Sequence, residues 1–262
     1  MTMRDTDQQI CQQAQRLRLT FLRDHLGDVL DSITRANMTP RDALAFALSK
    51  EIEQRDANHF RQALMAAHFP AVKSLEDFDL SAQPSIDPGV FQELCKLEWL
   101  QVGENVALFG SPGVGKTHLA IGLGRKALSK GYSVRFYAAA TLFSLLEKAS
   151  REGNLEARLR DLGKPQLLII DEVGYLPYSP ETAHLMYQLV CRRYEKKSLL
   201  ITSNRPPSEW SLIFADKMAA TAILDRLLHH CTALTIAGES YRLREHKKEA
   251  ALRATSSKAE EP

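Results

Sequence analysis

The sequence predicts a mixed α/β protein: a five-stranded parallel sheet covered by helices, preceded by a small all-helical domain. Three observations predict this class. Short apolar runs alternate with amphipathic segments from residue 105, apolar residues recur at three- and four-residue steps from residue 8 to about 68, and a glycine-rich loop follows the first apolar run. The chain has 262 residues, 44% apolar and 25% charged, which suits one large domain and a smaller one.

The first 70 residues carry only helical signals. Thr39 followed by Pro40 is typical of the start of a helix, because a threonine side chain caps the first turn and proline tolerates its first position. Pro70 bounds this region. We therefore predict a helical domain over 1–70 and a linker over 71–86, where periodic apolar positions are few.

The larger domain is expected over 87–246. Asp87 and Pro88 predict the start of another helix, which would run to about Leu100. The polar segment 247–262 has too few apolar residues to pack and is predicted to be a flexible tail. The five predicted strands are Val106–Phe109, Val134–Tyr137, Leu167–Ile170, Leu199–Thr202 and Ala233–Ile236.

The cysteines and the N-terminus indicate a cytoplasmic protein with no membrane contact. Cys11, Cys95, Cys191 and Cys231 lie far apart without a Cys-x-x-Cys pair, which fits neither a zinc site nor a disulfide framework. The N-terminus is polar, and no apolar run reaches the ~18 residues that span a bilayer.

A phosphate-binding loop follows the first strand. The glycines allow backbone N–H groups to face a phosphate, the lysine bridges the β- and γ-phosphates, and the threonine binds Mg²⁺. His118 comes next and is grouped with this cofactor site, although we expect its ring to pack rather than to act in catalysis. The loop residues are Gly110, Ser111, Pro112, Gly113, Val114, Gly115, Lys116 and Thr117.

Polar side chains end the next strands of the predicted sheet. Asp171 and Glu172 follow an apolar run without alternation, as expected for a strand buried on both faces, and ligand sites lie at the carboxyl ends of such strands. Asp171 would hold Mg²⁺ and Glu172 would activate a water molecule. Asn204 ends the following strand. Two roles stay open for it: a hydrogen bond to the water or γ-phosphate, and a turn before Arg205.

A later helix carries Asp225 and Arg226. Arg226 has two interpretations: a local ion pair with Asp225, and an arginine finger that reaches the γ-phosphate of a neighbouring subunit. On the same helix, His229 and His230 are adjacent and would point about 100° apart, so we assign no metal other than Mg²⁺.

These residues together resemble the AAA+ ATPases. The segments 110–117, 167–172, 203–204 and 224–227 are similar to the Walker A, Walker B, sensor 1 and arginine-finger motifs of that class. The connecting segments 69–79, 171–177, 202–210 and 238–243 resemble IstB-type transposition helper ATPases, relatives of the DnaC-type helicase loaders in the initiator clade. The resemblance covers about residues 14–246.

The resemblance implies an ATPase that binds ATP and Mg²⁺, assembles with itself as a ring or spiral on double-stranded DNA, and directs a cognate transposase to target DNA. DNA and assembly are expected to stimulate hydrolysis. It also implies a truncated or absent C-terminal lid, the helical part that usually carries a second sensor arginine. Two interpretations stay open for Arg242 and Arg244: one of them replaces that arginine, or both belong to a solvated basic face.

The helix pair predicted between the second and third strands resembles the inserted pair that lines the DNA path in this clade. Residues 118–165 hold nine basic and four acidic residues, so either DNA phosphates or the interspersed carboxylates could pair with the arginines and lysines. The candidate DNA contacts are Lys148, Arg151, Arg158 and Arg160.

Three other functions remain open. A replicative helicase loader would use the same ATPase on a helicase. A small-molecule kinase with a phosphate loop would act as a monomer, which the short C-terminus and the Asp171-Glu172 pair disfavour. A nucleotide-dependent DNA-binding scaffold would hydrolyse ATP slowly.

Overall fold

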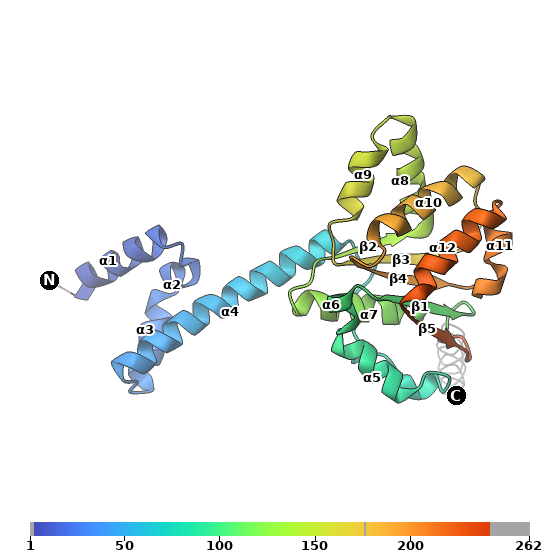
Figure 1. Cartoon of the computed structure of the whole chain (residues 1–262). Coiled ribbons are helices and arrows are strands. Elements are labelled where there is room, and N and C mark those ends of the chain that lie inside the picture. Colours follow the sequence, from blue (N-terminus) through green and yellow to red (C-terminus); the bar gives the residue numbers. More distant parts are fainter. Residues whose placement is uncertain (1–2, 176, 242–262) are drawn as a thin grey trace, which may run out of the picture. The chain divides into compact units, whose positions relative to one another are not determined.

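The computed structural model describes residues 3–175 and 177–241, and its internal contacts divide the chain into two compact units after Gln62 (Figure 1). The first unit is helical and the second contains the sheet. The predicted class, a five-stranded parallel sheet preceded by a helical region, is confirmed. In the part of the chain that is described, no helix is both long and apolar enough to cross a membrane.

The first unit consists of three short helices and most of a long fourth one. The fourth begins where predicted: Pro40 is its first residue, and the Thr39 hydroxyl accepts the N–H of Asp42 at 3.3 Å. The four helices are α1 (Met3–Arg16), α2 (Thr20–Asp24), α3 (Leu26–Arg35) and α4 (Pro40–Ala67), and the last turn of α4 belongs to the second unit.

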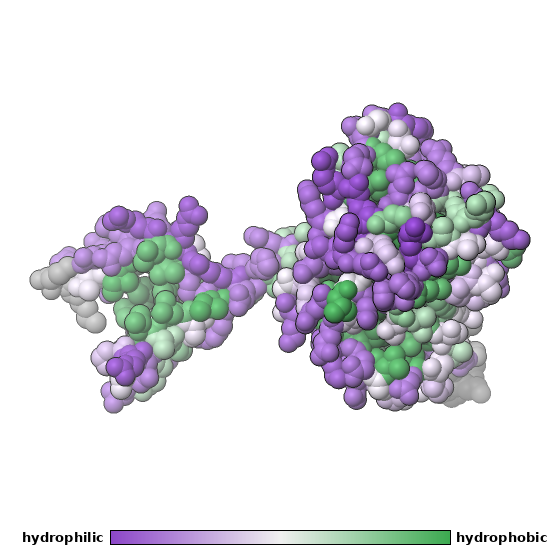
Figure 2. Space-filling model, viewed as in Figure 1, coloured by the Kyte–Doolittle hydropathy of each residue, from purple (hydrophilic) through white to green (hydrophobic). Residues whose placement is uncertain are grey.

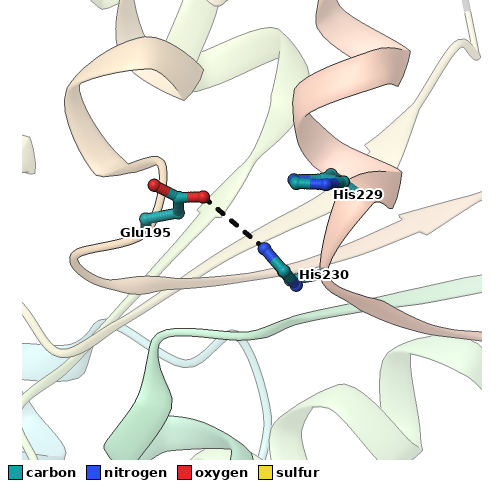
Figure 3. A group of neighbouring side chains, drawn as sticks. All are labelled: Glu195, His229 and His230. Carbon is teal, nitrogen blue, oxygen red and sulfur yellow. Dashed lines mark ion pairs between the residues drawn. The ribbon is translucent and has the colours of Figure 1, made fainter.

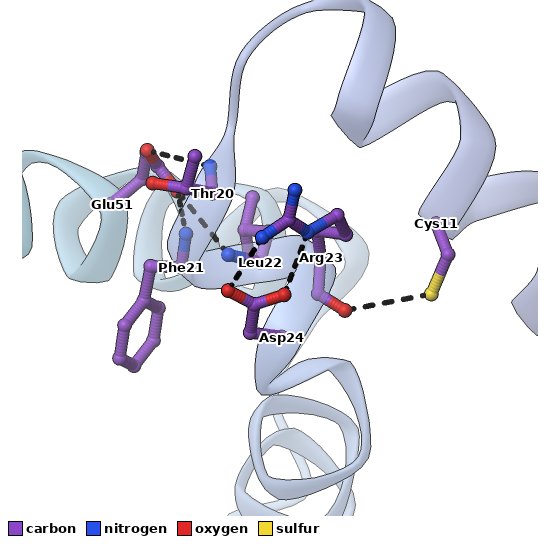
Figure 4. Close-up of polar contacts among 7 residues, drawn as sticks. All are labelled: Cys11, Thr20, Phe21, Leu22, Arg23, Asp24 and Glu51. Carbon is purple, nitrogen blue, oxygen red and sulfur yellow. Dashed lines mark hydrogen bonds and ion pairs between the residues drawn. The ribbon is translucent and has the colours of Figure 1, made fainter.

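A buried carboxylate joins α4 to α2. Glu51 is 2% exposed, and its two oxygens accept the N–H groups of Thr20, Phe21 and Leu22 at 2.8–3.2 Å (Figure 4). These donors form the first turn of α2, where N–H groups lack helical partners and the helix end is positive. Arg55, one turn along α4, pairs with the same carboxylate at 3.0 Å. The charge of Glu51 is therefore compensated from both sides.

An apolar stripe stays exposed on the first unit. Leu44, Leu48 and Ile52 follow one another at four-residue steps on α4, and Leu17 adds a further exposed apolar side chain. Apolar residues also gather on the face of this unit that Figure 2 shows. We call Leu44, Leu48 and Ile52 the α4 stripe.

The segment 71–86 differs from the predicted linker, because it belongs to the second unit and packs against a helix there. The reason lies in the small residues of α7 (Lys116–Ser129): a Cβ on Gly122 would lie 2.8 Å from the Leu75 side chain, so glycine there allows the close approach. Phe69 reaches Gly124 in the same way. The unit boundary consequently falls inside α4 and not at residue 70. One short helix, η1 (Leu80–Ala82), lies in this segment.

The helix predicted from Pro88 to about Leu100 is two helices, α5 (Pro88–Lys96) and α6 (Trp99–Val102). Its start is as predicted, since the Asp87 carboxylate accepts the N–H of Val90 at 3.0 Å. Leu97 interrupts it in a left-handed conformation, with φ at +66°. Its side chain is buried at 1% exposure, so packing compensates for the backbone strain.

Five parallel strands form the sheet, in the order β2-β3-β4-β1-β5. The inner strands are buried over most of their length, with Glu172 as the one exposed residue among them, which explains their apolar runs. In this order β4 lies between β1 and β3, so the ends of these three strands are neighbours. The strands are β1 (Asn105–Gly110), β2 (Val134–Ala138), β3 (Leu167–Val173), β4 (Ser198–Ser203) and β5 (Cys231–Ile236).

Helices cover both faces of the sheet (Figure 1). On one face lies α7 with the segment that contains Phe69 and Leu75. The other face holds the large apolar core, to which the five α-helices that follow β2 contribute. These are α8 (Ala139–Arg151), α9 (Leu155–Leu162), α10 (Pro180–Arg193), α11 (Trp210–Ile213) and α12 (Lys217–His229), with η2 (Pro207–Glu209) before α11.

A fully buried arginine fixes the end of α10. The Arg193 guanidinium donates to the carbonyls of Leu162 and Ser198, both at 2.7 Å, and to that of Pro165 at 3.1 Å. Burial lowers its pKa to about 9, so it remains charged at neutral pH. Arg193 thereby ties the chain that follows α10 to the starts of β3 and β4.

The described residues end at Tyr241. Arg242, Arg244, the C-terminal part of the predicted 87–246 domain and the predicted tail 247–262 lie outside them.

Candidate nucleotide-binding site

The glycine-rich loop joins β1 to α7, as the sequence predicts. Gly110 has a φ of +146°, and a Cβ there would collide with the carbonyl oxygen of Ile236 on β5, so glycine is required. Lys116 is 8% exposed, and its Nζ donates to the carbonyls of Gly110 and Ser111 at 2.6 and 2.8 Å. The ammonium group therefore lies inside the loop, beside the N-terminus of α7.

Asp171 is held by two threonines from different elements. The Thr117 hydroxyl, at the start of α7, donates to Asp171 Oδ1 at 2.9 Å. The Thr202 hydroxyl, on β4, donates to the same oxygen at 2.6 Å and accepts the N–H of Glu172 at 2.9 Å. Asp171 is 6% exposed and Thr202 is fully buried. The sequence analysis did not assign Thr202 a role; its position at the end of a strand beside the carboxylates was the available signal.

Glu172 is turned toward solvent by an irregularity in β3. The register between β3 and β4 shifts between Ile170 and Val173, and Glu172 has a φ of +62°. This left-handed conformation is unfavourable for a residue with a long side chain and is typical of functional positions. It leaves Glu172 exposed directly after the buried Asp171.

Asn204 follows β4, between the phosphate loop and the carboxylates. The turn after this strand is held by Ser203, whose hydroxyl accepts the N–H of Arg205 at 3.1 Å and donates to the carbonyl of Val173 at 2.7 Å. The Asn204 side-chain oxygen is buried and has no hydrogen-bond partner among the described residues. It is therefore available to a group that enters the site.

A cavity of about 470 Å³ brings these side chains together. It is lined by Lys116, Thr117, Glu172 and Asn204, with Pro112, Gly113 and Tyr175. A second cavity, of about 460 Å³, shares Gly113 and Thr117 and extends along the segment that contains Phe78. The two cavities thus lie on either side of the phosphate loop.

The oxygen donors fit a magnesium ion. Mg²⁺ prefers oxygen ligands and typically takes one or two from the protein, with phosphate oxygens and water completing its coordination. The hydroxyl of Thr117 and the carboxylate of Asp171 are within 2.9 Å of each other at the edge of the cavity. These two residues are the ones that the sequence predicts as metal ligands.

His118 connects the loop to the preceding segment. Its Nε2 lies 2.7 Å from the carbonyl oxygen of Ser74. The Phe78 ring lies edge-on to the imidazole, with 5.5 Å between the two ring centroids. His118 also lines the second cavity. The sequence analysis did not include Phe78 in the site, because it treated 71–86 as a linker.

Comparisons with known proteins agree with this geometry. The model of the IstB-like ATP binding protein family matches residues 12–250. The chain belongs to this family. It is 45% identical to the IS21 insertion-sequence ATP-binding protein of Pseudomonas aeruginosa, over 89% of this chain and 88% of that one. It is 39% identical to the corresponding IS5376 protein of Geobacillus stearothermophilus, over 88% of this chain and 92% of that one.

Solved structures share the fold. The IstB-like chain superposes on DnaI with a TM-score of 0.53 and 21% identity, over 63% of this chain and 91% of that one. It superposes on AMPPCP-bound DnaA from Aquifex aeolicus with a TM-score of 0.53 and 22% identity, over 70% of this chain and 56% of that one. The sheet unit therefore has the AAA+ fold.

Arg226 of the IstB-like chain lies outside both cavities. On α12, its guanidinium lies over the ring of Tyr187 on α10, 4.9 Å from the centroid, and it donates to the Ala222 carbonyl at 3.3 Å. Asn105 of β1 anchors the adjacent turn by donating to Leu227 at 3.0 Å. Within the described residues no salt bridge joins Arg226 to Asp225. The local ion pair is thus not formed.

The candidate DNA contacts lie on α8 and α9, as predicted, and all four side chains are exposed. Lys148 lies 3.8 Å from Glu152, and the Nε of Arg151 donates to the Glu147 carbonyl at 3.4 Å. Lys148 and Arg151 belong to α8, and Arg158 and Arg160 belong to α9. Both interpretations of the sequence analysis therefore keep support: the residues are accessible, and Lys148 has a carboxylate nearby.

The Thr202 hydroxyl is predicted to hold the site in place. Thr202→Val keeps the shape but removes the hydrogen bonds to Asp171 and to the Glu172 N–H. The Glu172 N–H then loses its partner, and the buried Asp171 carboxylate retains the bond from the Thr117 hydroxyl alone among the described residues. We expect the free energy of unfolding to fall by about 1–3 kcal/mol. Chemical denaturation measures this loss, and hydrogen exchange at the Glu172 amide should accelerate. Thr202→Ser keeps both bonds and should remain close to the original protein. Equal stability of Thr202→Val and Thr202→Ser would contradict this role.

Proposed function

We propose that this chain is an ATP-dependent DNA-binding transposition helper, which assembles on double-stranded DNA and directs its transposase to target DNA. One observation carries the enzymatic part: Lys116, Thr117, Glu172 and Asn204 converge on one cavity beside Asp171. Membership of the IstB-like family, with insertion-sequence relatives that match about nine-tenths of the chain, supports the role in transposition.

ATP hydrolysis to ADP and phosphate is the reaction that this site supports. The N-terminus of α7 and the Lys116 ammonium would bind the phosphates, and the nucleoside would occupy the second cavity along Phe78. Mg²⁺ on Thr117 and Asp171 would neutralise phosphate charge. Glu172, exposed at the cavity, would accept a proton from the attacking water, and the unpaired oxygen of Asn204 would position that water.

Arg226 is proposed to complete the site of a neighbouring subunit. It does not line its own nucleotide cavity, yet it is held in place by Tyr187 and by the turn that Asn105 anchors. An arginine supplied in trans stabilises negative charge in the transition state. Assembly would then be a condition for fast hydrolysis. The α4 stripe, three exposed apolar residues on the first unit, would provide a surface for a second copy of the chain.

The insertion-sequence relatives favour transposition over helicase loading. The likeness to DnaI, at 21% identity, concerns the fold, whereas the insertion-sequence proteins are 39–45% identical over most of both chains. The buried Asp171 followed by an exposed Glu172 favours hydrolysis over phosphate transfer to a small molecule, because a base at the cavity can activate water.

A mixing experiment tests the shared site. ATP turnover is measured with duplex DNA for Arg226→Ala, for Glu172→Gln and for equimolar mixtures of the two. Each variant alone should lose most of its activity, since an arginine finger contributes roughly 10³–10⁵ in rate. The mixture should recover part of it, because a Glu172→Gln subunit still supplies Arg226 to an intact neighbouring site. Lys217→Ala, an exposed cation on the same helix, is the matched control. A mixture without recovery would contradict the shared site.

The DNA contacts are tested by salt dependence. For a residue that contacts a phosphate, replacement by alanine should weaken duplex binding for all sequences and reduce the slope of log K against log salt by about 0.9. We expect this for Lys148, Arg151, Arg158 and Arg160, measured by fluorescence anisotropy over a salt series. Lys96→Ala, an exposed lysine on α5, should leave the slope unchanged. Unchanged slopes for all four would assign these residues to a solvated helix face.

A further inference from the structure

Three metal-binding side chains lie together at the ends of α10 and α12, apart from the nucleotide cavity. Glu195 follows α10, His229 is the last residue of α12, and His230 comes next (Figure 3). One ligand atom from each lies within 4.8 Å of the others, and His230 Nε2 is 3.5 Å from Glu195 Oε1. All three residues are exposed, so an ion could enter from solvent.

The end of α12 makes this convergence possible. Adjacent residues within a helix point about 100° apart, which would keep the two imidazoles separate. His230, however, is already outside the helix, with φ at −120° and ψ at 82°. The ring centroids of His229 and His230 are therefore only 4.1 Å apart. The geometric objection to a histidine pair does not hold for this turn.

Two further contacts position the ligands. The hydroxyl of Tyr194 lies 2.6 Å from Nδ1 of His229, which leaves Nε2 as the nitrogen that can bind an ion. A ligating histidine commonly donates its other ring N–H to an oxygen in this way. Tyr194 and Glu195 follow directly after Arg193, whose buried bonds to three carbonyls fix this part of the chain. Glu195 itself has a φ of +56°.

We propose that Glu195, His229 and His230 bind one Zn²⁺ ion or a similar divalent transition metal ion, with water completing the coordination. Two imidazoles and one carboxylate are a ligand set that Zn²⁺ uses, whereas Mg²⁺ prefers oxygen alone. A tetrahedral ion with bonds of ~2.0–2.1 Å holds its ligand atoms roughly 3.3 Å apart, close to the spacing between His230 and Glu195.

Such an ion would link the chain after α10 to the last turn of α12. Arg226 lies on α12 three residues before His229, and it already contacts α10 through Tyr187. Metal binding would thus hold together the two helix ends that position Arg226. Binding of the ion itself does not depend on the proposed ATPase, so the two proposals can fail separately.

Calorimetric titration of the full chain with Zn²⁺ tests the site. The protein carries no polyhistidine tag, is first freed of metal by a chelator, and is then kept in a buffer that contains Mg²⁺. We expect a binding event that His230→Ala and Glu195→Gln each weaken by about tenfold or more, on the scale of lost metal-site interactions. Co²⁺ should give a visible absorption band in the original protein that both variants lose. His184→Ala removes another exposed histidine, on α10, and should leave this event unchanged.

Two outcomes would overturn the proposal. One is the absence of this binding event in the original protein. The other is a Zn²⁺ affinity that is the same in His230→Ala, Glu195→Gln and His184→Ala. Glu195→Gln replaces one exposed side chain by another of the same shape, so circular dichroism and thermal melting should show an unchanged fold.

Discussion

The candidate site depends on the hydrogen bonds that surround Asp171. One carboxylate oxygen accepts from Thr117 at the start of α7 and from Thr202 on β4, while Asp171 itself lies buried on β3. Three elements that are distant in the sequence are thereby joined at one atom. The same Thr202 hydroxyl holds the backbone of Glu172 in its left-handed conformation. The proposed magnesium ligand Asp171 and the proposed base Glu172 are therefore placed by a single hydrogen-bond network.

The strand order explains why this network can form. Because β4 lies between β1 and β3, the residues that end β4 stand between the phosphate loop and the carboxylates. Thr202 uses this place to hold Asp171, Ser203 makes the turn, and Asn204 then presents an unpaired oxygen at the cavity. Three consecutive residues thus have three separate tasks. Arg226, on the other hand, is held against α10 away from this cavity, which suits a role across a subunit boundary.

The sequence predicted what depends on local pattern, and it missed what depends on tertiary contact. The phosphate loop, the strands and the cap at Thr39 were predictable, because the signals of glycines, short apolar runs and capping residues each extend over a few positions of the sequence. The packing of 71–86 was not, since Leu75 depends on Gly122 of α7, more than 40 residues along the chain. The contact of Glu195 with His230 was missed because His230 lies just past the end of α12, where the backbone is no longer helical.

We propose that Asp171 and Lys116 together bind one magnesium-bound nucleotide in this cavity. The most direct test is the affinity for AMPPCP, with and without Mg²⁺, in the original protein, in Asp171→Asn and in Lys116→Ala. We expect Mg²⁺ to strengthen AMPPCP binding to the original protein. Asp171→Asn should lose this gain and keep the affinity measured without Mg²⁺. Lys116→Ala should bind AMPPCP weakly in both conditions. An undiminished Mg²⁺ effect in Asp171→Asn, or full affinity in Lys116→Ala, would contradict it.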